Sequence, residues 1–342
     1  MGRVGDDNRK PIAASEGHQP PNPTRRMPGL KAVAATSPWL FELHQVTHRY
    51  GQTLALSDLT VQVPIDSIGL VGQNGAGKST LMQILLGLIR PTQGSARVLG
   101  RDVGSQGVAL RGTVGYMSER EAFVPGLKGI EYVALAGQLS GMSSRQAWRR
   151  AHETLSYLGM EEARYRYLEE YSVGMKQRLK LAAAMVHDPD LLLLDEPTSG
   201  LDPEGRNAML NVLRVLAARP NKALILSSHL LGDVERICRW TVILDQGRLL
   251  HSGPLDGLRS SRPSHYLLRW QSGRADGFLA SLSARDVQVT PIAGENAARV
   301  MVPSGWTNQT FFREARNHEV VLTGLVADED DLQSVYQRLV LK

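Results

Sequence analysis

The sequence predicts an α/β fold with a parallel core sheet, followed by a small α+β C-terminal domain. Two features of the first part predict the sheet: helical stretches alternate with short strands, and strands such as "LLLLD" at 191–195 are apolar along their whole length. Strands that are apolar on both faces are typical of parallel sheets covered by helices. After about Pro254 the order changes to βαββαβα, which fits a split βαβ sandwich.

We expect three segments along the chain. Residues 1–38 are rich in Pro, Gly and polar residues without periodicity, so we expect a disordered tail. Residues 39–254 form the main domain, and residues 255–342 form the accessory domain. That accessory domain is expected to close with an amphipathic helix whose apolar face carries Leu332, Val335, Tyr336, Leu339 and Val340.

Composition and charge limit the classes of partner. The chain has 342 residues, of which 42% are hydrophobic, and its most apolar stretch, at 81–89, is too short to span a bilayer. The net charge is +5, but residues 1–38 carry six basic and three acidic residues and so hold +3 of it. The folded part is nearly balanced, so we expect no nucleic-acid partner. A single cysteine, Cys238, cannot form an internal disulfide and fits a reducing compartment.

The first predicted strands lead to a phosphate-binding loop. Strands are expected at 39–50 and 54–64, and Tyr50, which ends the first of them, has an aromatic ring that could stack on adenine. A short apolar strand, "SIGLVG", then runs into "GQNGAGKST" at 72–80, which contains the pattern G-x-x-x-x-G-K-[ST] and opens a helix. This context predicts an ATP site formed by Gly72, Gln73, Asn74, Gly75, Ala76, Gly77, Lys78, Ser79 and Thr80.

Each residue type in that loop has a physical reason. Glycines let the backbone wrap closely around phosphates, and the N–H groups of the loop and of the new helix point toward them. Lys78 supplies a positive charge to the β- and γ-phosphates, and Ser79 supplies a hydroxyl to Mg²⁺.

Acidic and imidazole side chains are expected at the same edge of the sheet. The strand "LLLLD" delivers Asp195 and Glu196 to its carboxyl end, where ligands of parallel sheets bind. We expect Asp195 to hold Mg²⁺ through a water molecule and Glu196 to polarise the attacking water. His229 ends the strand "ALILSSH" and could orient that water beside the γ-phosphate.

A second helix start lies about a hundred residues after the first. In "YSVGMKQRLKLAAAMV", which begins at residue 171, Ser172 offers a hydroxyl and Gly174 lets a backbone N–H approach a ligand. The positive end of the helix that follows also attracts phosphate. Apolar residues recur at helical spacing in this stretch, which predicts one buried face.

These residues, in this order, resemble the nucleotide-binding subunit of an ATP-binding cassette (ABC) transporter. The resemblance covers roughly residues 40–250 and rests on "GQNGAGKST", "YSVGMKQRL", "LLLLDEPTSGLDP" and "SSH". It implies a P-loop NTPase cassette with a parallel core sheet, an antiparallel β subdomain and a helical subdomain. It also implies ATP hydrolysis coupled to transport, with Lys78, Glu196 and His229 as the catalytic residues.

The resemblance also implies partners. In the family two cassettes pack head to tail, so Ser172 and Gly174 would serve the partner's ATP and Asp202 would lie at the dimer seam. Since all catalytic elements are present, a homodimer is the simpler expectation. Tyr171, Val173 and Met175 depart from the family's common L-S-G-G-Q, and this form looks like the branch of drug, ion, lipid and polysaccharide exporters.

Glu119 marks a further departure. The family often has Gln there, and we expect Glu119 to contact Mg²⁺ through water. Residues 120–139 would then face the coupling helices of a separate membrane permease. That contact would place the protein in the cytoplasm, peripheral on the inner face of the cell membrane.

Two other functions remain open from the sequence. One is a soluble mechanical ATPase that acts on ribosomes or DNA, although such relatives usually carry two cassettes or a long heptad insert, and this chain shows neither. The other is a regulatory module that holds ATP without turnover, against which Glu196 and His229 argue.

Overall fold

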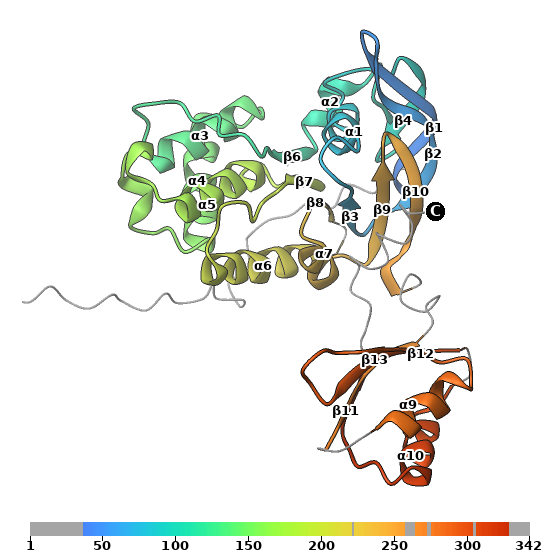
Figure 1. Cartoon of the computed structure of the whole chain (residues 1–342). Helices are drawn as coiled ribbons and strands as arrows, with labels where there is room; N and C mark the ends of the chain where they lie inside the picture. Colours follow the sequence, from blue (N-terminus) through green and yellow to red (C-terminus); the bar gives the residue numbers. More distant parts are fainter. Residues whose placement is uncertain (1–36, 221, 257–263, 272–274, 304–305, 328–342) are drawn as a thin grey trace, which may run out of the picture.

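The computed structural model describes residues 37–220, 222–256, 264–271, 275–303 and 306–327 (Figure 1). Nearly all of the expected N-terminal tail and the whole of the expected closing helix at 330–341 lie outside these residues. Within the part that is described, three sheets account for the strands. No helix in that part is long and apolar enough to cross a membrane.

The core of the main domain is a six-stranded sheet with the order β10-β9-β3-β8-β7-β6. Its strands are β3 (Ser67–Val71), β6 (Val114–Met117), β7 (Leu191–Asp195), β8 (Ala223–Ser227), β9 (Trp240–Asp245) and β10 (Arg248–Pro254). All neighbouring pairs are parallel except β9 with β10, which is an antiparallel edge. Every residue of β3 and β8 is buried, as expected for strands covered on both faces, and the predicted parallel sheet is confirmed.

An antiparallel sheet packs beside the phosphate loop. Its order is β2-β1-β4-β5, with β1 (Trp39–Tyr50), β2 (Thr53–Pro64), β4 (Gln93–Val98) and β5 (Arg101–Asp102). Its inner face shares one hydrophobic core with the helix that follows the loop, α1 (Lys78–Leu85), and with the short α2 (Gly107–Arg111). This sheet is the antiparallel β subdomain that the sequence predicts.

Helices fill the interval between β6 and β7 and form a second lobe (Figure 1). They are α3 (Gly129–Leu139), α4 (Ser144–Tyr157), two short 3₁₀ turns (Ala163–Tyr165 and Leu168–Glu170) and α5 (Val173–Met185). Beyond its first turn, α5 is buried on more than one face, because Gln177 and Lys180 are as well covered as Leu179. The expectation of a single buried face is therefore too narrow. Two further helices, α6 (Pro203–Ala217) and α7 (Leu231–Ile237), follow β7 and β8.

The third sheet has its own core. It contains β11 (Ser264–Trp270), β12 (Gln288–Pro291), β13 (Ala297–Val302) and β14 (Leu322–Ala327) in the antiparallel order β12-β13-β11-β14. The helices α9 (Asp276–Ser283) and α10 (Asn308–Asn317) contact each other and cover one face (Figure 1). Over the described residues this is the predicted split βαβ sandwich.

Phe311→Ala should destabilise this third core. Phe311 is fully buried and its ring meets that of Tyr266 edge-on at 5.1 Å. Removing such a side chain costs about 3–5 kcal/mol. Urea unfolding followed by tryptophan fluorescence would measure it, since Trp270 and Trp306 belong to or pack on this core. The neighbouring Phe312 is exposed, so Phe312→Ala should cost less than about 1 kcal/mol. Equal losses for the two variants would contradict the assigned core.

Candidate nucleotide site

The phosphate loop connects the end of β3 to the first turn of α1. Gly75 and Gly77 have φ angles of 84° and 101°, a region that side chains rarely adopt. A Cβ on Gly72 would lie 2.5 Å from the carbonyl oxygen of Leu244, so only glycine fits there. The glycine spacing in the sequence therefore reflects conformations that this loop requires.

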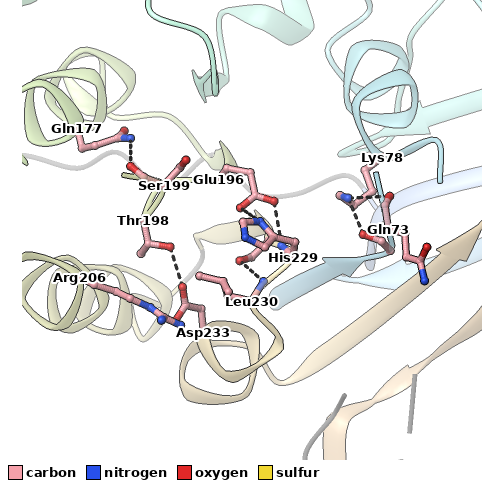
Figure 2. A network of polar contacts seen from close by, with 12 residues as sticks. Gln73, Lys78, Gln177, Glu196, Thr198, Ser199, Arg206, His229, Leu230 and Asp233 are labelled. Atoms are coloured by element: carbon pink, nitrogen blue, oxygen red, sulfur yellow. Dashed lines mark hydrogen bonds and ion pairs between the residues drawn. The ribbon is translucent and has the colours of Figure 1, made fainter. Parts of the chain in front are cut away.

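Lys78 lies over this loop at the start of α1. Its Nζ donates to the carbonyl oxygens of Gly72 at 2.6 Å and Gln73 at 3.2 Å (Figure 2). Only 8% of the residue is exposed. Burial lowers the pKa of Lys78, and the carboxylates of Glu196, Asp195 and Glu119 act in the opposite direction on that pKa. The lysine is thus a covered cation beside the acidic end of the sheet.

Asp195 and Glu196 lie at the end of β7, with 6% and 7% of each residue exposed. Burial is the main cause that raises the pKa of Asp195, and Glu119 and Glu196 raise it further, whereas Ser227 and Lys78 lower it. Glu196 has a φ of 48°, a left-handed conformation that costs energy in a residue with a side chain. Strain of this kind clusters at functional sites.

His229 follows β8 and binds both carboxylate oxygens of Glu196. Its backbone N donates to Oε1 at 2.9 Å, and its ring Nδ1 lies 2.9 Å from Oε2 (Figure 2). A carboxylate accepts hydrogen bonds, so Nδ1 carries a proton and Nε2 is the ring nitrogen left for a ligand. The imidazole is exposed while the carboxylate is covered. The two predicted residues are therefore in direct contact.

Tyr50 presents an exposed ring at the end of β1. Its hydroxyl donates to Oε1 of Gln83 on α1 at 3.0 Å, and its ring meets that of His48 at 4.6 Å in an edge-on arrangement. These contacts fix the orientation of the phenol, and the exposed ring is available for stacking.

The candidate metal ligands are Ser79, Asp195 and Glu119. Ser79 lies in the first turn of α1, and Glu119 is exposed two residues after β6, whose Met117 pairs with Leu194 next to Asp195. Among the described residues, no group of three or more His, Cys, Asp or Glu side chains is placed to hold a metal. A hydroxyl and one or two carboxylates are nevertheless hard oxygen donors that suit Mg²⁺, which usually takes substrate phosphates and water as its remaining ligands.

A second group of predicted residues lies in a different hollow. Ser172 caps α5 by accepting from the backbone N of Met175 at 3.3 Å, and Asp202 caps α6 by accepting from that of Gly205 at 3.0 Å. The two helix starts, including Gly174 in the first turn of α5, line a hollow of about 620 Å³. The structure thus brings Ser172, Gly174 and Asp202 together, apart from the residues of the phosphate loop.

Comparison with known proteins identifies the family. A family model described as "ABC transporter" matches residues 56–199. The chain is 31% identical over 277 residues to the ABC transporter ATP-binding protein YxlF of Bacillus subtilis, covering 80% of this chain and 90% of that one. It is 36% identical over 243 residues to the daunorubicin/doxorubicin resistance ATP-binding protein DrrA of Streptomyces peucetius, covering 70% and 73%. The chain belongs to the ATP-binding proteins of ABC transporters.

A solved structure of the ATP-binding subunit of an ABC transporter agrees with this. It superposes with a TM-score of 0.58 at 30% identity, over 65% of this chain and 92% of that one. The chain is therefore an ABC cassette that binds and hydrolyses ATP as a transporter subunit. The relatives do not support the alternative of a soluble ATPase that acts on ribosomes or DNA.

The loop after Glu196 in this cassette is fixed by contacts that the sequence reading missed. Asp233 on α7 is only 1% exposed and accepts from Thr198 Oγ1 at 2.7 Å, and from Nε and Nη2 of Arg206 at 2.9 and 2.5 Å (Figure 2). From the other side, Nε2 of Gln177 on α5 donates to the carbonyl oxygen of Ser199 at 2.9 Å. The sequence offers little sign of the buried Asp233. It lies next to the apolar Val234 on a short helix, and the structure buries both residues.

Arg206→Met should destabilise the cassette by about 3 kcal/mol, because it leaves the buried Asp233 carboxylate without its cation. Chemical denaturation would measure the loss of free energy of unfolding. Arg236→Met is the matched control, since Arg236 is exposed and its Nη1 donates to the neutral Oδ1 of Asn207. That change should stay within about 0.5 kcal/mol. Similar losses from both variants would show that Asp233 does not depend on Arg206.

Proposed function

We propose that this cassette works as one half of a head-to-tail pair that drives export through a separate membrane permease. The observation that carries the proposal is that one chain has two separate helix starts of the kind that binds phosphate. One follows the loop at 72–80, and the other borders the hollow between the starts of α5 and α6. A nucleotide held by the first site of one chain would be completed by the second site of its partner.

In this proposal the phosphate loop and Lys78 bind the phosphates, and the ring of Tyr50 stacks on adenine. Ser79 and Asp195, with Glu119, would hold Mg²⁺, which would supply positive charge beside the phosphates. The sites rest on the contacts described above and on the match of these residues to the motifs of the family.

Glu196 is proposed as the base. Its carboxylate has about four lone-pair sites, so the two contacts to His229 leave capacity to accept from a water molecule. The contact through Nδ1 turns the imidazole so that Nε2 can meet the γ-phosphate or the attacking water. His229 thereby fixes the carboxylate and orients the reactants.

We infer the partners from the same arrangement. The second cassette is a copy of this chain, and closure of the pair places Ser172, Gly174 and Asp202 against the partner's nucleotide. The permease contacts residues 120–139, where Val124 and Leu139 expose apolar side chains. Through that contact the cassette sits on the inner face of the cell membrane.

Export is the direction that similarity favours. DrrA is named for resistance to daunorubicin and doxorubicin, and the signature "YSVGM" departs from L-S-G-G-Q in the manner of the exporter branch. We propose residues 39–254 as the working cassette and residues 255–342 as an accessory unit for regulation or dimer contact. The separate hydrophobic core of the third sheet supports this division.

Two substitutions separate binding from hydrolysis. Glu196→Gln should lower phosphate release at least about 100-fold, because it removes the base, while ATP binding is kept. Lys78→Ala should weaken ATP binding about ten- to a hundredfold through loss of a charged donor. Phosphate release and titration with a fluorescent ATP analogue measure the two effects. Lys222→Ala is the control, since Lys222 precedes β8 at the opposite end of the sheet. Normal turnover of Glu196→Gln would overturn the assigned base.

A pull-down tests the permease. The Glu196→Gln chain would be tagged, membranes solubilised gently with Mg-ATP present, and the proteins that co-purify identified. We expect a polytopic membrane protein that is lost with Leu139→Asp and kept with Val108→Asp, since these two side chains are equally exposed, at 81% and 80%, and Val108 lies outside residues 120–139. Recovery of ribosomes or DNA without a membrane protein would contradict the proposed function.

A further inference from the structure

Two lysines of the helix α5 contact the segment that carries Glu119. Lys176 and Lys180 lie four residues apart, and therefore on the same side of the helix. Lys176 Nζ lies 2.9 Å from Oε2 of Glu121. Lys180 Nζ donates to the carbonyl oxygens of Ser118 at 2.9 Å and Glu119 at 3.1 Å. The helix that begins at Ser172 is thus tied to the backbone on either side of Glu119.

Of the two lysines, Lys180 is the unusual one. Only 6% of it is exposed, and its ammonium donates to two backbone carbonyl oxygens. Burial lowers the pKa of Lys180, whereas the charges of Glu121, Glu119 and Asp195 raise it. A buried ammonium is costly to place, and two carbonyl oxygens of one short segment are its partners. Its contacts therefore fix the position of that backbone.

The fixed backbone lies next to a candidate metal ligand. β6 pairs in parallel with β7, so Met117 is opposite Leu194 and the residues that follow each of them run side by side. Glu119 is exposed and makes no described contact of its own side chain with Asp195, although its charge raises the pKa of Asp195. The backbone at Glu119 therefore determines the region that its carboxylate can reach.

We propose that Lys180 is a positioning residue for the magnesium site, because it fixes the backbone that holds Glu119 beside Asp195. The inference rests on the proposed function, in which these carboxylates bind Mg²⁺ together with ATP. It also gives α5 a second task. The helix that presents Ser172 to the partner's nucleotide would also position, about two turns later, a ligand of its own chain's metal.

The test measures metal binding, so that it does not depend on turnover. The full-length chain with Glu196→Gln would be loaded with ATP, and Mn²⁺, as the probe ion, would be titrated with its free concentration followed by electron paramagnetic resonance. Lys180→Met keeps most of the apolar stem and removes the donor. We expect about tenfold weaker Mn²⁺ binding, as is usual when a group that orients a metal ligand is lost. Lys180→Arg, which keeps the charge and the donors, should recover most of the affinity.

Lys222→Met is the matched control. Lys222 Nζ also donates to two successive carbonyl oxygens, those of Asp188 at 3.1 Å and Pro189 at 2.8 Å, but it lies at the amino end of β8. Its loss should leave Mn²⁺ affinity unchanged. An equal loss in the control, or an unchanged or tighter affinity in Lys180→Met, would overturn the inference.

A double substitution shows whether Lys180 acts through Glu119. In a Glu119→Gln background, Lys180→Met should weaken Mn²⁺ binding by less than about twofold, because the ligand that it positions is already gone. A full tenfold effect in that background would overturn the inference. If Lys180→Met fails to fold, Lys180→Gln, whose shorter side chain carries a neutral amide in place of the ammonium, takes its place in both titrations. ATP binding without metal separates the two hypotheses. If the parent chain does not bind ATP, the proposed function is contradicted. If it binds ATP and Lys180→Met leaves the Mn²⁺ affinity unchanged, only the inference is contradicted.

Discussion

The parallel pairing of β3, β8 and β7 is the constraint on which the candidate site depends. Ser227 of β8 pairs with Leu70 on one side and with Asp195 on the other, so the three strands end at one level. Whatever follows each strand must therefore converge at the same edge. The phosphate loop, the Glu196 carboxylate and His229 meet there because each comes within two residues of a strand end. No long-range feature beyond strand register is needed to assemble them.

Because these segments meet at one edge of the sheet, several charged side chains are buried together there. Lys78, Asp195 and Glu196 are all less than a tenth exposed, and burial disfavours the charged form of each kind of group. The opposite charges offset part of this cost, as the effects of Asp195 and Glu196 on the pKa of Lys78 indicate. The left-handed backbone at Glu196 adds strain. Such a site is less stable than its surroundings, and the surrounding sheet and the two large hydrophobic cores hold it in place.

The parts that the sequence predicted are those with local patterns. Apolar runs located the strands of the parallel sheet, and glycine spacing located a loop whose φ angles only glycine adopts easily. The third sheet was also predicted from local patterns, because the order of its strands and helices can be read along the chain. The contacts that the sequence did not predict join residues far apart along the chain. Lys180 binds carbonyl oxygens about sixty residues earlier, and Asp233 binds Arg206 and Thr198 on other elements. From sequence alone, a lysine or aspartate in a helix is expected to face solvent. For this reason α5 was expected to bury a single face.

Those long-range contacts decide how the two phosphate sites of one cassette relate to each other. Only six positions separate Glu196, at the proposed site of hydrolysis, from Asp202, at the hollow proposed for the partner's nucleotide. A flexible loop of that length would absorb a small shift at either end. Here the loop is held at Thr198 by Asp233 and at Ser199 by Gln177, so its middle has little freedom to move independently (Figure 2). If Glu196 is displaced, either Asp202 moves with it or the contacts of the loop break. The second outcome would separate the buried Asp233 carboxylate from Thr198 and Arg206. Since breaking a buried ion pair is costly, movement as a unit is the less expensive response. In the proposed function, this short and anchored path would link movement at Glu196 to movement at Asp202.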